Sequence, residues 1–305
     1  MNDLSPAVAA RGYLSRGWQI TPVMPGGKQP LNKGWQKNDV TEPMISELFR
    51  DHTNIGIRLG TPSGGLVDVD IDSATCLRLT DLLPPTGLTH GRSSKKRSHF
   101  WYQIDGNPPQ TIQFKHPVTG GMLIEIRSTG GQTVVPPSHY QIGGKKEKLT
   151  WDEFGSPGQI TSDELRVNVS RIAAIALVAD EWKSGSRHLK ALALSGVLLR
   201  GGYTQAQAES FLRAVCEAAK DDEVKDRMAA LSDTSKNLAN NRPATGLPSL
   251  AALLGERVVE AIQNWLSLRA PTFNESFAWE LPLSFDKINT PEIPADLLPG
   301  VFGEF

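Results

Sequence analysis

Leu66-Val67-Asp68-Val69-Asp70-Ile71-Asp72 is the most informative stretch of this 305-residue sequence. Apolar and acidic residues alternate along it, and a period of two residues is the signature of a β-strand. Val67, Val69 and Ile71 share one face of that strand, and the three carboxylates share the other. The sequence therefore predicts a strand with one apolar face and one acidic face.

The acidic face needs a source of positive charge. Three carboxylates on one strand repel one another where the local dielectric is low. Hard divalent cations such as Mg²⁺ or Mn²⁺ bind carboxylate oxygens and would neutralise the cluster. A solvated face of an edge strand is the alternative, and it is the commoner explanation of an isolated Asp-x-Asp. Because the opposite face is apolar and β-branched, as in a central strand, the pattern favours a metal site.

Met122–Arg127 is a second alternating strand with a carboxylate. It places Glu125 and Arg127 on one face, so Glu125 would complete a cation site with Asp70 and Asp72. A simple pairing between Glu125 and Arg127 is the alternative role.

Arg97-Ser98-His99 begins a third strand with a cation, a hydroxyl and an imidazole. Together these groups would bind a triphosphate through charge-assisted hydrogen bonds. A basic hairpin tip with a surface histidine is the alternative.

Strands and short helices fill the first 157 residues, which predicts an α+β domain. Lys95-Lys96-Arg97 is expected in the connection before the strand that contains His99. The strands are expected at 18–23, 54–59, 66–72, 87–91, 99–104, 122–127 and 132–135, and the helices at 5–16, 41–51 and 74–83.

The pattern changes after Pro157 to apolar residues at helical spacing. This predicts a small all-α domain over 158–269, followed by a Pro-rich linker over 270–305. Its helices are expected at 161–182, 188–199, 204–219, 223–231 and, as one or two helices, 249–268.

Composition excludes several classes of protein. The longest apolar run, 172–179, is far shorter than the roughly 20 residues that a membrane helix needs. The first residues carry no secretory signal, and two cysteines are too few for a disulfide scaffold. We therefore expect a reduced, cytoplasmic protein without a membrane segment. Residues 1–150 carry 17 basic and 12 acidic side chains, which suits a phosphate-bearing partner, whereas the rest of the chain is net acidic.

Three motifs together carry a family resemblance: Leu66 to Asp72, Arg97-Ser98-His99 and Glu125-Ile126-Arg127. They lie in the order and spacing of the motifs of archaeo-eukaryotic primases. The chain resembles in particular the primase–polymerase (prim-pol) branch of plasmids, phages and other mobile elements, over about residues 5–155. Supporting segments are Pro25–Pro30 with Gly34-Trp35, Asn54–Ile57 with Gly60, and Gly130-Gly131 leading into Pro136-Pro137-Ser138.

The resemblance implies an RRM-like sheet core with flanking helices and a two-metal nucleotidyl transferase. By position, Asp70 and Asp72 match the acid-x-acid motif, Glu125 the third acid and His99 the phosphate-binding histidine. Asp68 stands where the family usually has an apolar residue, and it is an alternative metal ligand.

Further residues are assigned by the same resemblance. Arg127, Lys28, Ser98 and Arg97 are candidates for binding the nucleotide, although Arg97 stands where the family has a small residue. The basic segment 95–97 would alternatively contact the template backbone. The helical unit resembles accessory domains that follow prim-pol cores.

The leading hypothesis is therefore a DNA primase–polymerase that uses Mg²⁺ or Mn²⁺, a single-stranded DNA template and nucleoside triphosphates. One alternative is a non-catalytic module that binds nucleic acid or nucleotide during replication. A nucleotide-sugar transferase is a weaker alternative, because it leaves His99 and Glu125 unexplained. The Pro-rich end suggests a fragment of a longer protein, with a helicase as a candidate partner in the same chain or in trans.

Overall fold

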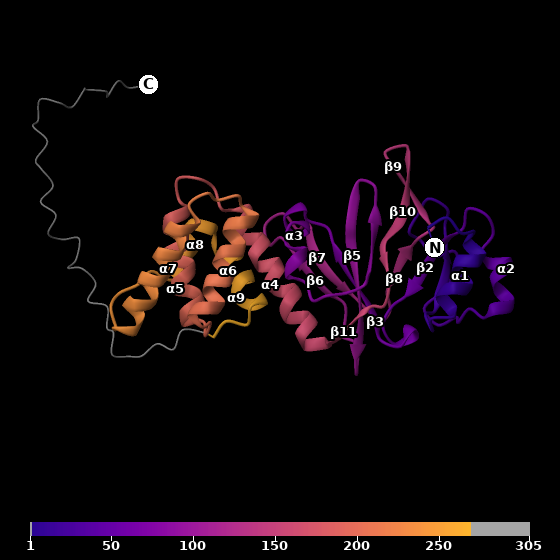
Figure 1. Cartoon of the computed structure of the whole chain (residues 1–305), viewed down its shortest axis with the longest axis horizontal. Coiled ribbons are helices and arrows are strands. Elements are labelled where there is room, and N and C mark those ends of the chain that lie inside the picture. Colours follow the sequence, from indigo (N-terminus) through magenta and orange to yellow (C-terminus); the bar gives the residue numbers. More distant parts are fainter. Residues whose placement is uncertain (1, 270–305) are drawn as a thin grey trace, which may run out of the picture. The chain divides into compact units, whose positions relative to one another are not determined.

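Antiparallel sheets dominate the first half of the chain and helices the second half in the computed structural model, which describes residues 2–269 (Figure 1). The α+β class predicted from the sequence is confirmed.

The larger sheet carries the strand with the alternating acids. Along its antiparallel path the order is β6 (Ile112–Lys115), β7 (Met122–Arg127), β3 (Leu66–Ile71), β5 (Lys95–Asp105), β4 (Leu88–Arg92), β10 (Lys145–Phe154) and β9 (His139–Ile142). An eighth strand, β11 (Gly158–Thr161), pairs in parallel with the end of β5.

A smaller sheet is built from β1 (Ile20–Val23), β2 (Asn54–Arg58) and β8 (Gln132–Val135), in that order. Within the described residues the α-helices are α1 (Pro6–Leu14), α2 (Ile45–Leu48), α3 (Ala74–Leu77), α4 (Ser162–Asp180), α5 (Arg187–Arg200), α6 (Gln205–Ala218), α7 (Val224–Ala239), α8 (Leu247–Leu254) and α9 (Glu256–Trp265), and the 3₁₀ turns are η1 (Glu42–Met44), η2 (Thr61–Ser63) and η3 (Thr80–Leu82).

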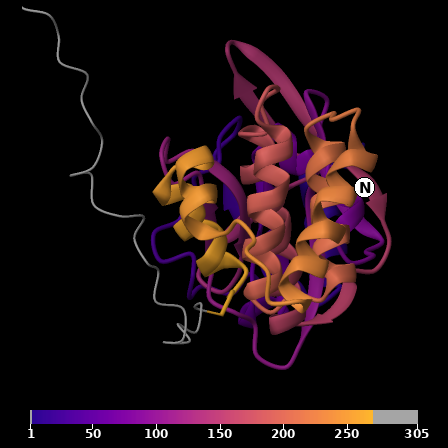
Figure 2. The same ribbon diagram turned by 90° about the vertical axis from the view of Figure 1, so that its left-hand side faces the viewer.

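The apolar face of β3 packs against helices. Val67, Val69 and Ile71 are fully buried in one hydrophobic cluster with residues of α4, α5, α6 and other helices. Helix α4 contacts both β7 and β11, and Figure 2 shows the helices in front of the strands. The predicted apolar face of this strand is therefore the face that the helices cover.

Helix α4 begins with a capping box. The Thr161 hydroxyl accepts a hydrogen bond from the Glu164 backbone N–H, and the Glu164 carboxylate accepts one from the Thr161 backbone N–H. Each bond satisfies a backbone donor that the first helical turn leaves free. The cap directly follows β11, so it fixes where the chain leaves the sheet.

The opposite face of the large sheet is partly covered by the small sheet and α1. Tyr13 of α1, Ile57 of β2 and Trp101 of β5 are buried in a second cluster. The Tyr13 hydroxyl donates to the Pro136 carbonyl oxygen and accepts from the indole N–H of Trp151 at 2.9 Å. The acids of β3 lie on the part of this face that the small sheet does not cover.

Three local predictions need correction. Lys95-Lys96-Arg97 belongs to β5 and is not a connection, because it continues the hairpin with β4. The predicted helix over 41–51 is a 3₁₀ turn followed by the short α2, and the one over 74–83 is split between α3 and η3. Strands β6, β9, β10 and β11 were not predicted at all.

The division between residues 157 and 158 stays a prediction. The sheet and the helices share one hydrophobic cluster, since Ile124 and Ile126 of β7 and Leu165 of α4 all belong to it. The predicted linker over 270–305 lies outside the described residues. Within those residues, no helix is both long enough and apolar enough to span a membrane.

Removal of the helices should expose the back of the sheet. A fragment of residues 1–160 would leave Val69, Ile124 and Ile126 without α4, and exposed apolar faces of this kind promote aggregation. We expect size-exclusion chromatography to show aggregates for this fragment, whereas the chain through residue 269 stays monodisperse. A monodisperse fragment with a cooperative thermal transition would contradict this expectation.

A substitution at Gly60 should disturb the entry into β3. Gly60 has φ +72°, and a Cβ atom there would lie 2.5 Å from the Thr129 backbone nitrogen. Gly64 has a similar φ of +66°, but open space surrounds its Cβ position. We expect Gly64→Ala to cost about 1–2 kcal/mol and Gly60→Ala at least about 3 kcal/mol of unfolding free energy, measured by urea denaturation. Equal costs would show that the contact with Thr129 is unimportant.

Candidate active site

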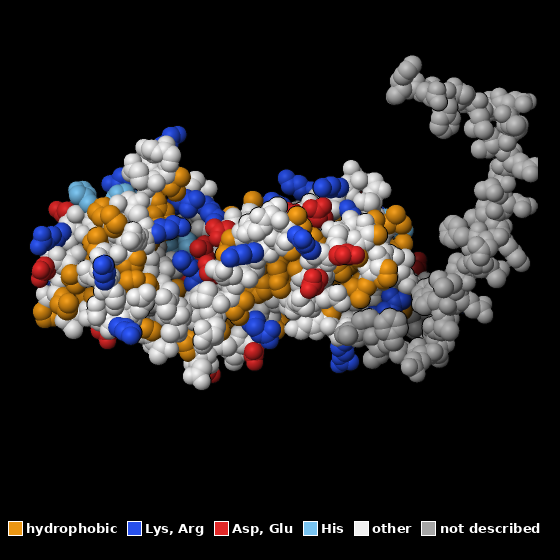
Figure 3. Space-filling view, turned by 180° about the vertical axis from the view of Figure 1, so that it is seen from behind, with side chains coloured by type: hydrophobic (Ala, Val, Ile, Leu, Met, Phe, Trp, Pro, Cys, Tyr) orange, Lys and Arg blue, Asp and Glu red, His pale blue; other side chains and the backbone are white. Residues whose placement is uncertain are grey.

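The registers of β3, β5 and β7 bring acidic and basic side chains together on one face. Asp70 lies directly opposite His99 on β5 and Glu125 on β7, and Asp68 lies opposite Arg127 on β7. Figure 3 shows basic, acidic and histidine side chains beside one another on the face of the molecule turned away from Figure 1. We call Asp68, Asp70, His99, Glu125 and Arg127 the polar cluster.

Asp68 is the buried member of the polar cluster. Its side chain is fully buried, and one carboxylate oxygen accepts hydrogen bonds from His99 Nδ1 at 2.9 Å and from Thr133 Oγ1 at 2.7 Å. Burial opposes ionisation, but the charge and hydrogen bond of His99 lower the pKa of this carboxyl below its ordinary value. The other oxygen, Oδ1, is buried without a hydrogen-bond partner in the described structure.

His99 is oriented by this contact. Because a carboxylate only accepts hydrogen bonds, the proton of the shared bond is on Nδ1, and Nε2 points toward Asp70 Oδ1, 3.6 Å away. Burial disfavours the imidazolium, but the carboxylates of Asp70 and Asp68 raise the pKa of His99 above its ordinary value. A charged His99 partly compensates both acids.

A second histidine stacks on the first. The rings of His90 and His99 lie 4.2 Å apart at an angle of 14°. His90 Nδ1 accepts from the indole N–H of Trp101 at 2.9 Å, so Nε2 must be the atom that donates to the Val134 carbonyl oxygen at 3.2 Å. Burial, followed by the charge of His99, holds the pKa of His90 well below its ordinary value. His90 is therefore a neutral platform for the charged ring.

Arg127 supplies the other positive charge. Its guanidinium lies 3.4 Å from Glu125 Oε2 and 3.7 Å from Asp70 Oδ2, and it donates to Thr133 Oγ1 at 3.1 Å. Burial lowers and the charges of Asp68, Asp70 and Glu125 raise the pKa of Arg127, with a net increase. Two cations thus face three carboxylates, which leaves the polar cluster with an excess of negative charge.

Asp70 is the least satisfied carboxylate. The residue is only 9% exposed, yet within residues 2–269 its carboxylate accepts no hydrogen bond and has cations only at 3.6 and 3.7 Å. Glu125 lies opposite it and accepts one hydrogen bond from Gln113 at 2.8 Å. Hard oxygen donors with unused lone pairs fit a divalent cation.

Asp72 lies just beyond the end of β3 and pairs with a lysine outside the polar cluster. Its carboxylate accepts from Lys95 Nζ at 3.0 Å, and its side chain is 44% exposed. Across the described part of the chain, no group of three or more His, Cys, Asp or Glu side chains is close enough to hold a metal as the side chains stand. Two of the three predicted ligands therefore face each other, and the third is engaged by a lysine.

Arg97 and Ser98 do not join the polar cluster. The Arg97 guanidinium pairs with Glu153, and its backbone N–H donates to Asp152 Oδ2 at 2.9 Å. Ser98 is buried, and the alternation of β5 places it on the helix-covered face with Phe100. The side chains of Arg97, Ser98 and His99, predicted to act together, thus have three separate environments.

Lys28 contacts the aromatic ring of Tyr140. Its ammonium is 5.2 Å from the centre of the Tyr140 ring, a cation–π contact. Burial, followed by the charge of Asp70, raises the pKa of Tyr140. The Gly26-Gly27 turn thus places Lys28 over a tyrosine whose ionisation is opposed by an acid of the polar cluster.

The first half of the chain matches a known protein family. A family model described as bifunctional DNA primase/polymerase, N-terminal, matches residues 10–159. This segment belongs to that family. Membership supports a function of the DNA primase/polymerase type in replication, with DNA and nucleotides as substrates and nucleotidyl transfer as the chemistry. A comparison with curated proteins found no match.

Two residues that contact the polar cluster were not found from the sequence. Thr133 bridges Asp68 and Arg127 from the small sheet, and His90 supports His99 from β4. The Thr133 contact joins two strands that are distant in sequence and lie in different sheets, and the His90 contact depends on the register of the β4–β5 hairpin. Asp68, which stands where the family usually has an apolar residue, was the available signal, because a buried carboxylate requires hydrogen-bond donors around it.

Replacing Asp68 by Asn should cost more stability than the same replacement at Asp72, because Asp68 is buried and Asp72 is exposed. Asp68→Asn removes a buried charge that His99, Thr133 and Arg127 surround, so we expect it to cost roughly 3 kcal/mol of unfolding free energy. Asp72→Asn breaks a partly exposed pair and should cost less than about 1 kcal/mol. Urea denaturation of the two variants measures the difference, and similar midpoints would refute the structural role of Asp68.

Proposed function

We propose that this chain is a template-dependent nucleotidyl transferase that makes and extends primers on single-stranded DNA. The observation that carries the proposal is the register that places Asp70 between His99 and Glu125 on adjacent strands. This register brings carboxylates that could bind cations and basic side chains that could bind phosphate to one face of the sheet.

His99, Arg127 and Lys28 would bind the triphosphate. His99 presents Nε2 toward Asp70 while Asp68 holds Nδ1, and Arg127 presents a guanidinium between Asp70 and Glu125. Charge-assisted hydrogen bonds from such groups to phosphate oxygens are strong and directional. Arg97 and Ser98 stay as predicted contacts, but the pairing of Arg97 with Glu153 and the burial of Ser98 argue for a lesser contribution.

Asp70, Asp72 and Glu125 would hold Mg²⁺ or Mn²⁺. When bound, a pair of such ions activates the primer hydroxyl and stabilises the leaving pyrophosphate. The donor set fits, because Asp70 is nearly buried without a hydrogen bond and Asp72 is held only by Lys95. In the structure Lys95 and Arg127 balance the charge of these acids. When cations bind, the acids would contact the cations in place of Lys95 and Arg127.

Asp68 would act as a positioning residue and not as a metal ligand. Its side chain is fully buried, and one of its oxygens is already committed to His99 and Thr133. This places Asp68 behind His99, where it fixes the ring and favours its charged form.

The remaining assignments are part of the same proposal. The antiparallel strands β7, β3, β5 and β4 with α4 on one face are compatible with an RRM-like core. The helical region would assist primer initiation, and association with a helicase stays a prediction.

Asp70→Asn should abolish nucleotide incorporation without unfolding the chain. We expect a loss of at least about 100-fold, since even residues that only support a metal ligand change activity 10–100-fold. Incorporation of labelled nucleotides on circular single-stranded DNA, with and without an annealed primer, measures it in Mn²⁺ and in Mg²⁺. Asp81→Asn is the matched control, because Asp81 is an exposed acid of η3.

The arms of this experiment distinguish the alternatives. Products without a primer indicate a primase, and products only with a primer indicate a polymerase. If the folded wild-type chain binds DNA but incorporates no nucleotide, the catalytic proposal fails and a non-catalytic binding module replaces it. Full activity of Asp70→Asn would refute the assignment of the acids.

A further inference from the structure

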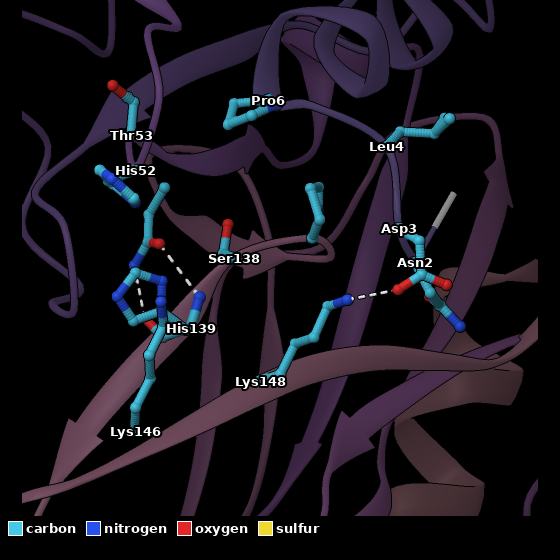
Figure 4. A pocket seen from close by; sticks show the side chains of 12 residues that line it. Asn2, Asp3, Leu4, Pro6, His52, Thr53, Ser138, His139, Lys146 and Lys148 are labelled. Carbon is cyan, nitrogen blue, oxygen red and sulfur yellow. Dashed lines mark hydrogen bonds and ion pairs between the residues drawn. The ribbon is translucent and has the colours of Figure 1, made fainter.

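A pocket of about 450 Å³ lies next to the β9–β10 hairpin (Figure 4). Its walls come from three segments: the N-terminal residues 2–6, the loop at 52–54, and the hairpin with the preceding residues 137–139. This volume is within the range of small-ligand sites in proteins.

Basic side chains outnumber acidic ones in the lining of the pocket. His52, His139, Lys146 and Lys148 line it, and Asp3 is the single carboxylate among the lining residues. Asp3 is already paired with Lys148 at 2.6 Å. In the described structure, Lys146 and His52 make no ion pair. The pocket therefore presents positive charge that no carboxylate of its own compensates.

Lys146 and His52 are close enough to His139 for their charges to act on it. Burial, followed by the charges of Lys146 and His52, lowers the pKa of His139. Figure 4 shows these three side chains on one side of the pocket, with Lys148 directed at Asp3. Such mutual repulsion is relieved when an anion binds among the groups.

Two asparagines hold the walls of the pocket through hydrogen bonds to backbone groups. Asn54 Nδ2 donates to the His139 carbonyl oxygen at 2.7 Å, and Asn54 Oδ1 accepts from the His139 N–H at 3.1 Å. Asn2 makes the corresponding pair of bonds with the Trp151 backbone, at 2.8 and 3.2 Å. The pocket is thus formed before any ligand binds.

Strand β9 separates the pocket from the polar cluster. His139 lines the pocket, whereas burial and then the charge of Asp70 raise the pKa of its neighbour Tyr140, whose ring lies 5.2 Å from the Lys28 ammonium. The register of the hairpin pairs His139 with Lys148 and Tyr140 with Glu147, so Lys146 is on the pocket face and Lys145 on the other.

We propose that this pocket binds a phosphate group of a nucleic-acid strand or nucleotide, at a second site across β9 from the polar cluster. Lys146 and His52 would contact the phosphate from two walls, with His139 between them. The choice of a nucleic-acid phosphate rests on the proposed function, whereas the anion site itself rests on the lining.

Binding of a labelled single-stranded oligodeoxynucleotide to the full chain tests the site. Loss of one lysine–phosphate contact lowers the slope of log K against log salt by roughly 0.7, which is about fivefold in affinity at 0.1 M salt. We expect this loss for Lys146→Gln and a smaller loss for His52→Gln. Lys145→Gln is the matched control, and it should bind like the wild type.

A second arm uses a fluorescent nucleoside triphosphate with the same variants. Weaker oligonucleotide binding assigns the pocket to a DNA backbone, and weaker nucleotide binding alone assigns it to a free nucleotide; both support the site. Unchanged binding in both arms, or equal losses for Lys145→Gln and Lys146→Gln, would overturn it. Since Asp70→Asn tests incorporation and these variants test binding, failure of one proposal is distinct from failure of the other.

Discussion

A buried carboxylate at the centre of the large sheet constrains the arrangement around it. Asp68 is fully buried on β3, and an unpaired charge in that position would be prohibitively costly. His99, Thr133 and Arg127 reach it from β5, β8 and β7. Since β8 belongs to the small sheet, this one acid links both sheets. The polar cluster is therefore part of the framework that joins the sheets as well as a candidate site.

The same constraint fixes the register of three strands. A slip of one residue would exchange the two faces of β3, which would expose Val67, Val69 and Ile71 and bury the acids against the helices. The helix-covered face and the polar cluster thus specify each other. Because α4 packs directly behind β7, the acids are held on a rigid support, as a site that must position charged groups requires.

Features encoded locally could be predicted from the sequence. The strands Met122–Arg127 and Gln132–Val135 have the predicted bounds, since alternation and the Gly130-Gly131 turn define them locally. Strand β10 was missed because the run Lys145-Lys146-Glu147-Lys148 hides its alternation of pocket-facing and outward residues. The division of Arg97 from His99 was equally hidden, because it depends on pairing with Glu153 and on a positive φ of 47° at Arg97.

The site was predictable as a set of motifs but not as a set of contacts. Alternation alone groups Asp68, Asp70 and Asp72 on one strand face, yet each has a different environment. Asp68 is buried and hydrogen-bonded, Asp70 is nearly buried without a hydrogen bond, and Asp72 is exposed beside Lys95. These differences arise from the neighbouring strands and the end of β3, which local patterning does not report. Three chemically identical residues therefore have three environments, and Asp70 is the one of the three whose nearly buried carboxylate accepts no hydrogen bond within the described residues, so that both of its oxygens keep lone pairs for a cation.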